Sequence, residues 1–347
     1  MKKALILLSF TLLFFSFSEE NLSKQYAQTI TKEDLLEHLS FLANDNLKGR
    51  LTGSVEQKMA AHYIASHFAQ NDIMKVANRV NDSTQIYSYF QKFYLKEYFG
   101  GRFSPMINPT PENIKSNGVM ATENVLGLVE GTDKKEEFVV VSAHYDHIGT
   151  KNGTIYNGAD DDGSGTVAMM GIAKAFAKAK KEGHPSRRSI LFIAFTGEEQ
   201  GLLGSSYYTS NPLIPLKNII CDLNIDMVGR IDREHRKNHD YLYLVGSDRL
   251  SKDLHNLSEI TNKSTLNLKL DYKYNVESDE LKLYYRSDHF NFAQYKIPII
   301  FYTSGLHQDY HESTDDLEKI DFDILQKRTQ LIFHTAWEIA NREEGLK

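Results

Sequence analysis

The chain has 347 residues, of which 41% are hydrophobic and 25% are charged, a composition that excludes a disordered or fibrous protein. A formal net charge of -6 and a pI near 6.1 exclude the basic footprint of a nucleic-acid-binding protein. No repeat recurs at a fixed period, which excludes a solenoid. The length is enough for one large α/β domain or two smaller domains.

The first residues predict a signal peptide. Two lysines precede an apolar run over residues 5–17, and small residues stand before Glu19. The run is short for a membrane span, so we expect a secretory signal peptide over residues 1–18 in preference to an uncleaved anchor. We therefore expect an exported protein, periplasmic or extracellular, without a stable membrane anchor after cleavage. The single cysteine, Cys221, allows no internal disulfide, and we expect it to be buried.

Two helices are predicted next along the chain. Thr31 and Ser54 each begin a capping-box pattern, and apolar residues then recur at helical spacing. The segment between the two helices, residues 47–54, is a loop punctuated by glycine. Residues 75–118 are crowded with aromatic side chains that alternate, which predicts an edge hairpin followed by a loop.

Strands and helices alternate through the rest of the chain. Apolar strands are predicted over residues 136–144, 188–197, 219–227 and 297–305, and helices over residues 164–181 and 323–342. Continuously apolar strands that alternate with helices indicate a mostly parallel sheet with both faces covered. We therefore expect an α/β fold in which residues 19–347 form a single domain. Its centre is a mostly parallel mixed β-sheet covered by helices on both faces.

Polar residues collect directly after these apolar strands. They are His144, Asp146 and His147, then Glu198 and Glu199, then Asp226, then His307 and His311, with Asp160, Asp161 and Asp162 between the first strand and its helix. Each residue alone is more often a cap, a turn residue or a solvated pair. Together they would meet at one edge of a parallel sheet, where so many carboxylates need cations between them. Mixed histidine and carboxylate ligands suit zinc better than magnesium or calcium.

The sequence NGADDDGSGT, residues 157–166, has its own chemical logic. One aspartate of the triplet can bridge two metal ions, with one oxygen for each ion. The flanking glycines allow the backbone to turn sharply, and backbone N–H groups at the start of the next helix can hold the neighbouring carboxylates. In GEE, residues 197–199, one glutamate can bind a metal while the other takes a proton from water.

Six motifs in this order carry a resemblance to a known family. They are SAHYDHIG, NGADDDGSGT, TGEEQGLLGS, NIDMVGR, RSDHFNF and DYHESTDDLEKID, and LKGRLTGS precedes them. From about residue 30 to the C-terminus the chain resembles the exported di-zinc aminopeptidases of metallopeptidase family 28. The resemblance implies two zinc ions as cofactors.

The resemblance also implies a role for individual residues. His144 and Asp226 would bind one zinc ion, Glu199 and His311 the other, and Asp161 would bridge the two. Glu198 would be the general base, Asp146 would stand behind His144, and Tyr310, in preference to Tyr284, would stabilise the oxyanion. The bond between Asp161 and Asp162 would be cis. We expect His147 and His307 to be structural, and the polar segment 232–285 to build the rim of the pocket.

The implied function is that of a zinc aminopeptidase acting on peptides with a free N-terminus. It would hydrolyse the N-terminal peptide bond through a hydroxide shared by two metals. Two alternatives stay open: a glutaminyl-cyclase-like transferase with a single zinc ion, and a non-catalytic receptor or binding domain on the same fold. The complete ligand set speaks against both alternatives.

Overall fold

The structure is a computed structural model that describes residues 22–81, 84–98 and 100–346. The predicted signal peptide lies outside these residues. Among the described residues, no helix is both long and apolar enough to cross a bilayer. The helices are α2 Lys32–Leu42, α3 Val55–Gln70, α4 Pro111–Ile114, α5 Gly165–Lys181, α6 Leu203–Ser210, α7 Lys252–Ser264, α8 His289–Gln294 and α9 Phe322–Asn341.

The strands fall into one large sheet and two small hairpins within the described residues. They are β1 Val76–Asn81, β2 Thr84–Ser88, β3 Phe90–Tyr98, β4 Arg102–Pro105, β5 Val119–Val129, β6 Lys134–His144, β7 Gly149–Lys151, β8 Thr154–Tyr156, β9 Arg188–Phe195, β10 Ile219–Ile225, β11 Tyr241–Val245, β12 Lys269–Asp271 and β13 Ile299–Thr303. The large sheet has nine strands in the order β12-β11-β13-β10-β6-β9-β5-β3-β4. Its central strands β13, β10, β6 and β9 are parallel, and antiparallel pairs extend it on both sides.

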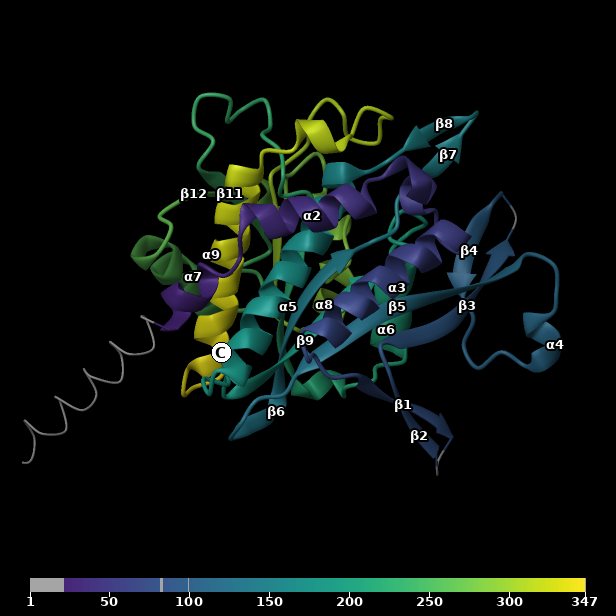
Figure 1. Cartoon of the computed structure of the whole chain (residues 1–347), viewed down its shortest axis with the longest axis horizontal. Helices are drawn as coiled ribbons and strands as arrows, with labels where there is room; N and C mark the ends of the chain where they lie inside the picture. The colour runs from purple at the N-terminus through teal and green to yellow at the C-terminus, as the bar shows by residue number, and fades with distance from the viewer. Residues whose placement is uncertain (1–21, 82–83, 99, 347) are drawn as a thin grey trace, which may run out of the picture.

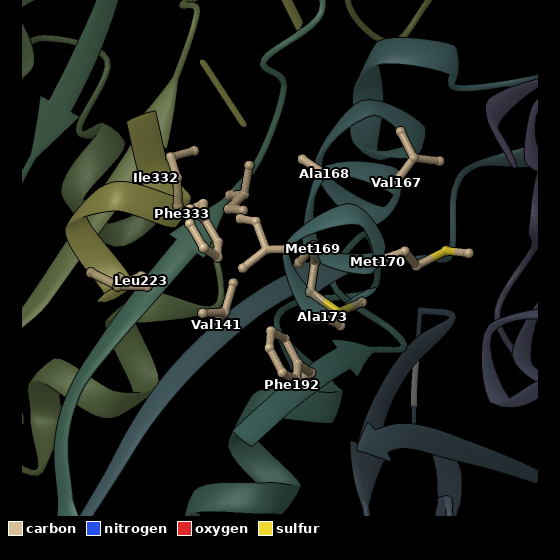
Figure 2. Packing of buried hydrophobic residues seen from close by; sticks show 14 of the residues in the cluster. Val141, Val167, Ala168, Met169, Met170, Ala173, Phe192, Leu223, Ile332 and Phe333 are labelled. Carbon is tan, nitrogen blue, oxygen red and sulfur yellow. The ribbon is translucent and has the colours of Figure 1, made fainter. Parts of the chain in front are cut away.

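Alternate residues of the central strands enter different cores. In β6, Val139 and Val141 pack under α5 and α9, whereas Val140 packs on the opposite face with the residues of α6 and α8. Figure 1 shows α2, α3, α5 and α9 layered over one face of the sheet. Figure 2 shows Val141 of β6 and Phe192 of β9 beside side chains of α5 and α9. Because both faces are buried, the strands read as continuous apolar runs, and the predicted mixed α/β sheet is confirmed.

The predicted helix starts at the N-terminal end are confirmed as N-caps, but the reciprocal half of each capping box is not formed: the Gln57 side chain accepts the N–H of Gly53 and not that of Ser54. The Thr31 hydroxyl accepts the N–H of Asp34 at the start of α2, and the Ser54 hydroxyl accepts the N–H of Gln57 at the start of α3. Cys221 is buried in β10. The aromatic segment forms the β1–β2 hairpin and the edge pair β3–β4, with the short helix α4 in the following loop.

The segment 232–285 differs in part from its expected role. Much of it is architecture: β11 and β12 extend the sheet, and α7 packs beside α9 through the buried side chain of Leu254. Only its end, Leu283, lines the cavity at the candidate site. The sequence did not predict β11, because this strand is only five residues long and lies within a polar segment.

Candidate metal centre

The candidate residues meet because four parallel strands end at one edge of the sheet. β6 ends at His144, β9 is followed by Glu198 and Glu199, and β10 is followed by Asp226. The loop after β13 supplies His311. Since β9, β6, β10 and β13 are neighbours in this order, their carboxyl ends gather these side chains in one place, as the sequence predicts.

The first group of candidate ligands is His144, Asp161 and Asp226, all of them buried. His144 Nε2 lies 3.2 Å from Asp161 Oδ1 and 3.7 Å from Asp226 Oδ2. The Ser287 hydroxyl donates to Asp226 Oδ2 at 2.7 Å and fixes that carboxylate. One imidazole and two carboxylates at these separations fit a shared cation.

The second group shares Asp161. His311 Nε2 lies 3.1 Å from Asp161 Oδ2 and 3.2 Å from Glu199 Oε2. Asp161 therefore faces His144 with one oxygen and His311 with the other, which is the arrangement a bridging carboxylate requires.

His147 is a residue of this group that the sequence reasoning placed among the structural ones. Its ring is buried, and its Nδ1 lies 2.7 Å from Glu199 Oε1 and 4.0 Å from Asp161 Oδ2. With these two carboxylates it forms a second set of atoms that could hold a metal ion. The available signal was its position three residues after His144, immediately beyond the same strand. His307 keeps the structural role, because its Nε2 contacts Asp160 at 3.1 Å.

The three adjacent aspartates separate because each carboxylate has different partners. Asp160 accepts the N–H of Gly229 at 2.6 Å and contacts His307. Asp162 accepts the N–H groups of Gly165, Met227 and His144. Gly165 is the first residue of α5, so the predicted anchoring of a carboxylate at that helix start is confirmed.

Only Asp161 remains free to face the two groups of candidate ligands. The bond between Asp161 and Asp162 is cis, as the resemblance implies. Asp315 accepts the backbone N–H groups of Asp160 and Asp161 and so ties this turn to the loop that carries His311. The sequence reasoning gave Asp315 no role.

Glu198 and Asp146 stand at the first group. Glu198 Oε2 lies 3.9 Å from His144 Nε2. Asp146 Oδ1 lies 3.8 Å from His144 Nδ1, which is beyond hydrogen-bond distance, and the backbone oxygen of Asp146 faces that nitrogen at 3.2 Å. The Asp146 carboxylate instead accepts the Thr52 hydroxyl at 2.7 Å and the N–H of Glu198 at 3.2 Å. Asp146 therefore orients the Glu198 backbone as well as standing behind His144.

The electrostatics of the site call for cations. Burial raises the pKa of Glu198 well above its usual range. Burial opposes a charge on His144, but the neighbouring carboxylates of Glu198 and Asp226 outweigh burial and raise the pKa of His144. Among the described residues, His144 Nε2, Asp161 Oδ2 and Glu199 Oε1 are buried and make no well-directed hydrogen bond, although each lies close to another candidate ligand atom. Buried nitrogen and oxygen atoms that face one another in this way fit shared divalent metal ions.

A cavity opens beside the ligands. It has a volume of about 30 Å³ and is lined by Asp161, Glu198, Asp226, Met227, Leu283, Arg286, Phe301, Thr303, Leu306, Tyr310 and His311. Tyr310 therefore lies at the site, and its hydroxyl accepts an N–H of Arg286 at 3.0 Å. Tyr284 is not among the lining residues; its ring lies under the guanidinium of Arg249 at 3.9 Å.

Comparison with known proteins agrees with this geometry. The chain is 28% identical to aminopeptidase YwaD of Bacillus subtilis over 234 residues, which are 65% of this chain and 46% of YwaD. The chain thus spans about half the length of that relative. The fold is shared with the LapA aminopeptidase of Legionella pneumophila, with a TM-score of 0.67 at 18% identity over 94% of this chain and 76% of LapA. It is also shared with the glutaminyl cyclase of Porphyromonas gingivalis, with a TM-score of 0.61 at 16% identity over 88% and 97% of the two chains.

The family model described as peptidase family M28 matches residues 124–336. The matched region includes every strand that ends at the site, both groups of candidate ligands and most of α9. It covers more than half of the chain. The chain is a member of peptidase family M28, a family of zinc-binding exopeptidases.

Proposed function

We propose that this protein is an exported aminopeptidase that binds two zinc ions and hydrolyses the N-terminal peptide bond of peptides. One observation carries the proposal. The two oxygens of Asp161 face two separate groups of candidate ligand atoms, with the buried His144 and Asp226 on one side and Glu199 with the more exposed His311 on the other. The zinc ions, when bound, would lower the pKa of a water molecule and polarise the scissile carbonyl.

The side chains of the site divide the remaining chemistry. Glu198 lines the cavity beside His144, where it can accept the proton of the attacking water and deliver it to the leaving amine. Tyr310 accepts a hydrogen bond from Arg286, which leaves its own O–H free to donate to the oxyanion. Burial raises the pKa of Tyr310, so this donor keeps its proton at neutral pH.

The lining of the cavity suits a terminal residue of a peptide. Apolar side chains of Leu283, Phe301 and Leu306 form part of its wall and suit the side chain of a terminal residue.

A direct assay tests the proposal. The zinc-loaded protein should hydrolyse leucine p-nitroanilide and should leave N-acetyl-leucine p-nitroanilide intact. A glutaminyl peptide should be shortened by one residue and should not be cyclised. Hydrolysis of the acetylated substrate would reject the aminopeptidase assignment. Cyclisation without hydrolysis would favour the glutaminyl cyclase, whose fold this chain shares.

A further inference from the structure

Arg286 places a positive charge at the mouth of the cavity. It follows the short helical turn Leu283–Tyr285 and lines the same cavity as Glu198, Asp226 and Tyr310. Its side chain is exposed, so the guanidinium is accessible to a molecule entering the site.

Most of the hydrogen-bonding capacity of Arg286 is unused. One N–H donates to the Tyr310 hydroxyl, and within the part of the chain that the structure describes no carboxylate lies within 4.0 Å of the guanidinium. Two other arginines are paired with carboxylates: Arg187 contacts Asp133 at 2.6 Å, and Arg230, on the loop after β10, contacts Asp309 at 2.7 Å. A guanidinium carries five N–H donors in a planar fork that matches a carboxylate.

The described lining of the cavity gives Arg286 no paired counter-ion. Asp161, Glu198 and Asp226 line the same cavity, but these carboxylates face the proposed zinc ions and none forms an ion pair with the guanidinium. A carboxylate that enters with the substrate can therefore pair with Arg286.

We propose that Arg286 recognises a carboxylate of the substrate, so that the enzyme prefers short peptides with a carboxylate close to the scissile bond. This inference rests on the proposed function. The carboxylate has two sources: the C-terminus of a dipeptide, or an acidic side chain next to the bond that is cut. A bidentate pair between the guanidinium and either carboxylate has the same geometry.

Matched peptides separate the sources. Leu-Gly against Leu-Gly amide tests the C-terminal carboxylate. Leu-Glu amide against Leu-Gln amide tests an acidic second residue, and Glu-Gly amide against Gln-Gly amide tests an acidic first residue. For at least one pair, the zinc-loaded enzyme should show a kcat/KM about tenfold higher for the carboxylate, which corresponds to one good charge-assisted contact.

Arg286→Gln should remove that preference, mainly through KM. Arg249→Gln is the matched control, because it deletes the same charge from an arginine that stacks on Tyr284 and does not line the cavity. The control should keep the wild-type ratio. If Arg286→Gln slows both members of every pair equally, Arg286 only positions Tyr310 and the inference is wrong; absence of any preference in the wild type also overturns it.

A binding measurement makes the test independent of turnover. In a Glu198→Gln background, calorimetry should show tighter binding of the preferred carboxylate peptide than of its amide, and adding Arg286→Gln should abolish the difference. Failure of the proposed function looks different: the wild-type enzyme then hydrolyses none of the six peptides. Even in that case, the inference would be wrong if the Glu198→Gln protein, which keeps Arg286, bound the carboxylate peptide and its amide equally.

Discussion

Arg50 offers the sharpest test of how the fold holds the metal centre. Its buried guanidinium donates to four backbone carbonyls, those of Tyr145 at 2.8 Å, Leu42 at 2.6 Å, Asn157 at 2.6 Å and Gly158 at 3.0 Å. Tyr145 directly follows His144, and Asn157 and Gly158 come just before the aspartate triplet. Arg50 thus joins the two backbone segments that carry candidate ligands.

The perturbation is Arg50→Met, which keeps the length and removes every donor. Four hydrogen bonds from a charged donor, each worth about 1.5–3 kcal/mol, sum to roughly 6–12 kcal/mol. The variant no longer buries a charge, and the desolvation penalty that this removes offsets several kcal/mol of the loss. We therefore expect the free energy of unfolding to fall by about 3–5 kcal/mol. This is a large part of the total of about 5–15 kcal/mol for a typical domain.

Urea unfolding of the zinc-free protein measures the stability, and zinc retention against a chelator measures the site. We expect Arg50→Met to lower zinc affinity by about 10–100-fold, the usual effect of disturbing groups that orient ligands. Arg188→Met is the control: Arg188 is equally buried and donates to the carbonyls of Ile339 and Arg342, away from the site. It should lose stability and keep zinc. Wild-type zinc affinity in a folded Arg50→Met protein would refute the reasoning.

Three further predictions concern the site and the core. Asp161→Asn should weaken metal binding at both sites together. Asp160→Asn should lower stability and leave the metal content near that of the wild type, because Asp160 contacts Gly229 and His307 and no candidate ligand. Zinc retention during dialysis against a weak chelator compares the two variants, and greater loss of zinc from Asp160→Asn would contradict the bridging role of Asp161. Glu198→Gln should cut turnover by at least about 10²-fold with zinc still bound, which steady-state kinetics and metal analysis check together. Burial lowers the pKa of His67 to about 4, so its stabilising effect is complete above the unfolded pKa near 6.5 and is lost as the pH falls. Urea unfolding should therefore show a cost of about 2 kcal/mol between pH 7 and pH 5 that His67→Gln reduces; an unchanged pH dependence would contradict this.

Much of the fold could be predicted because the central strands are buried on both faces. Val139, Val140 and Val141 enter opposite cores, so the strand has no polar face and appears as an apolar run. The helix starts at Thr31 and Ser54 were predictable because capping is a local interaction between residues close in the chain. The strand β11 was missed because it is short and lies within a polar segment.

The candidate ligands could be predicted because the ends of parallel strands converge, but their supports could not. Arg50 acts on carbonyls about a hundred residues away, and Asp315 acts on the N–H groups of Asp160 and Asp161. Backbone atoms carry no residue-specific signal, so no pattern in the sequence marks these contacts. The proximity of His147 to Glu199 likewise depends on how the loop after β6 packs.

The central claim is that Asp161 bridges two zinc ions. An anomalous difference map from crystals of the zinc-loaded protein, recorded at the zinc absorption edge, tests it most directly. The account predicts two peaks about 3.5–4 Å apart, one beside His144 and Asp226 and the other beside Glu199 and His311, with Asp161 between them. A single peak in fully active, zinc-saturated protein would contradict the account.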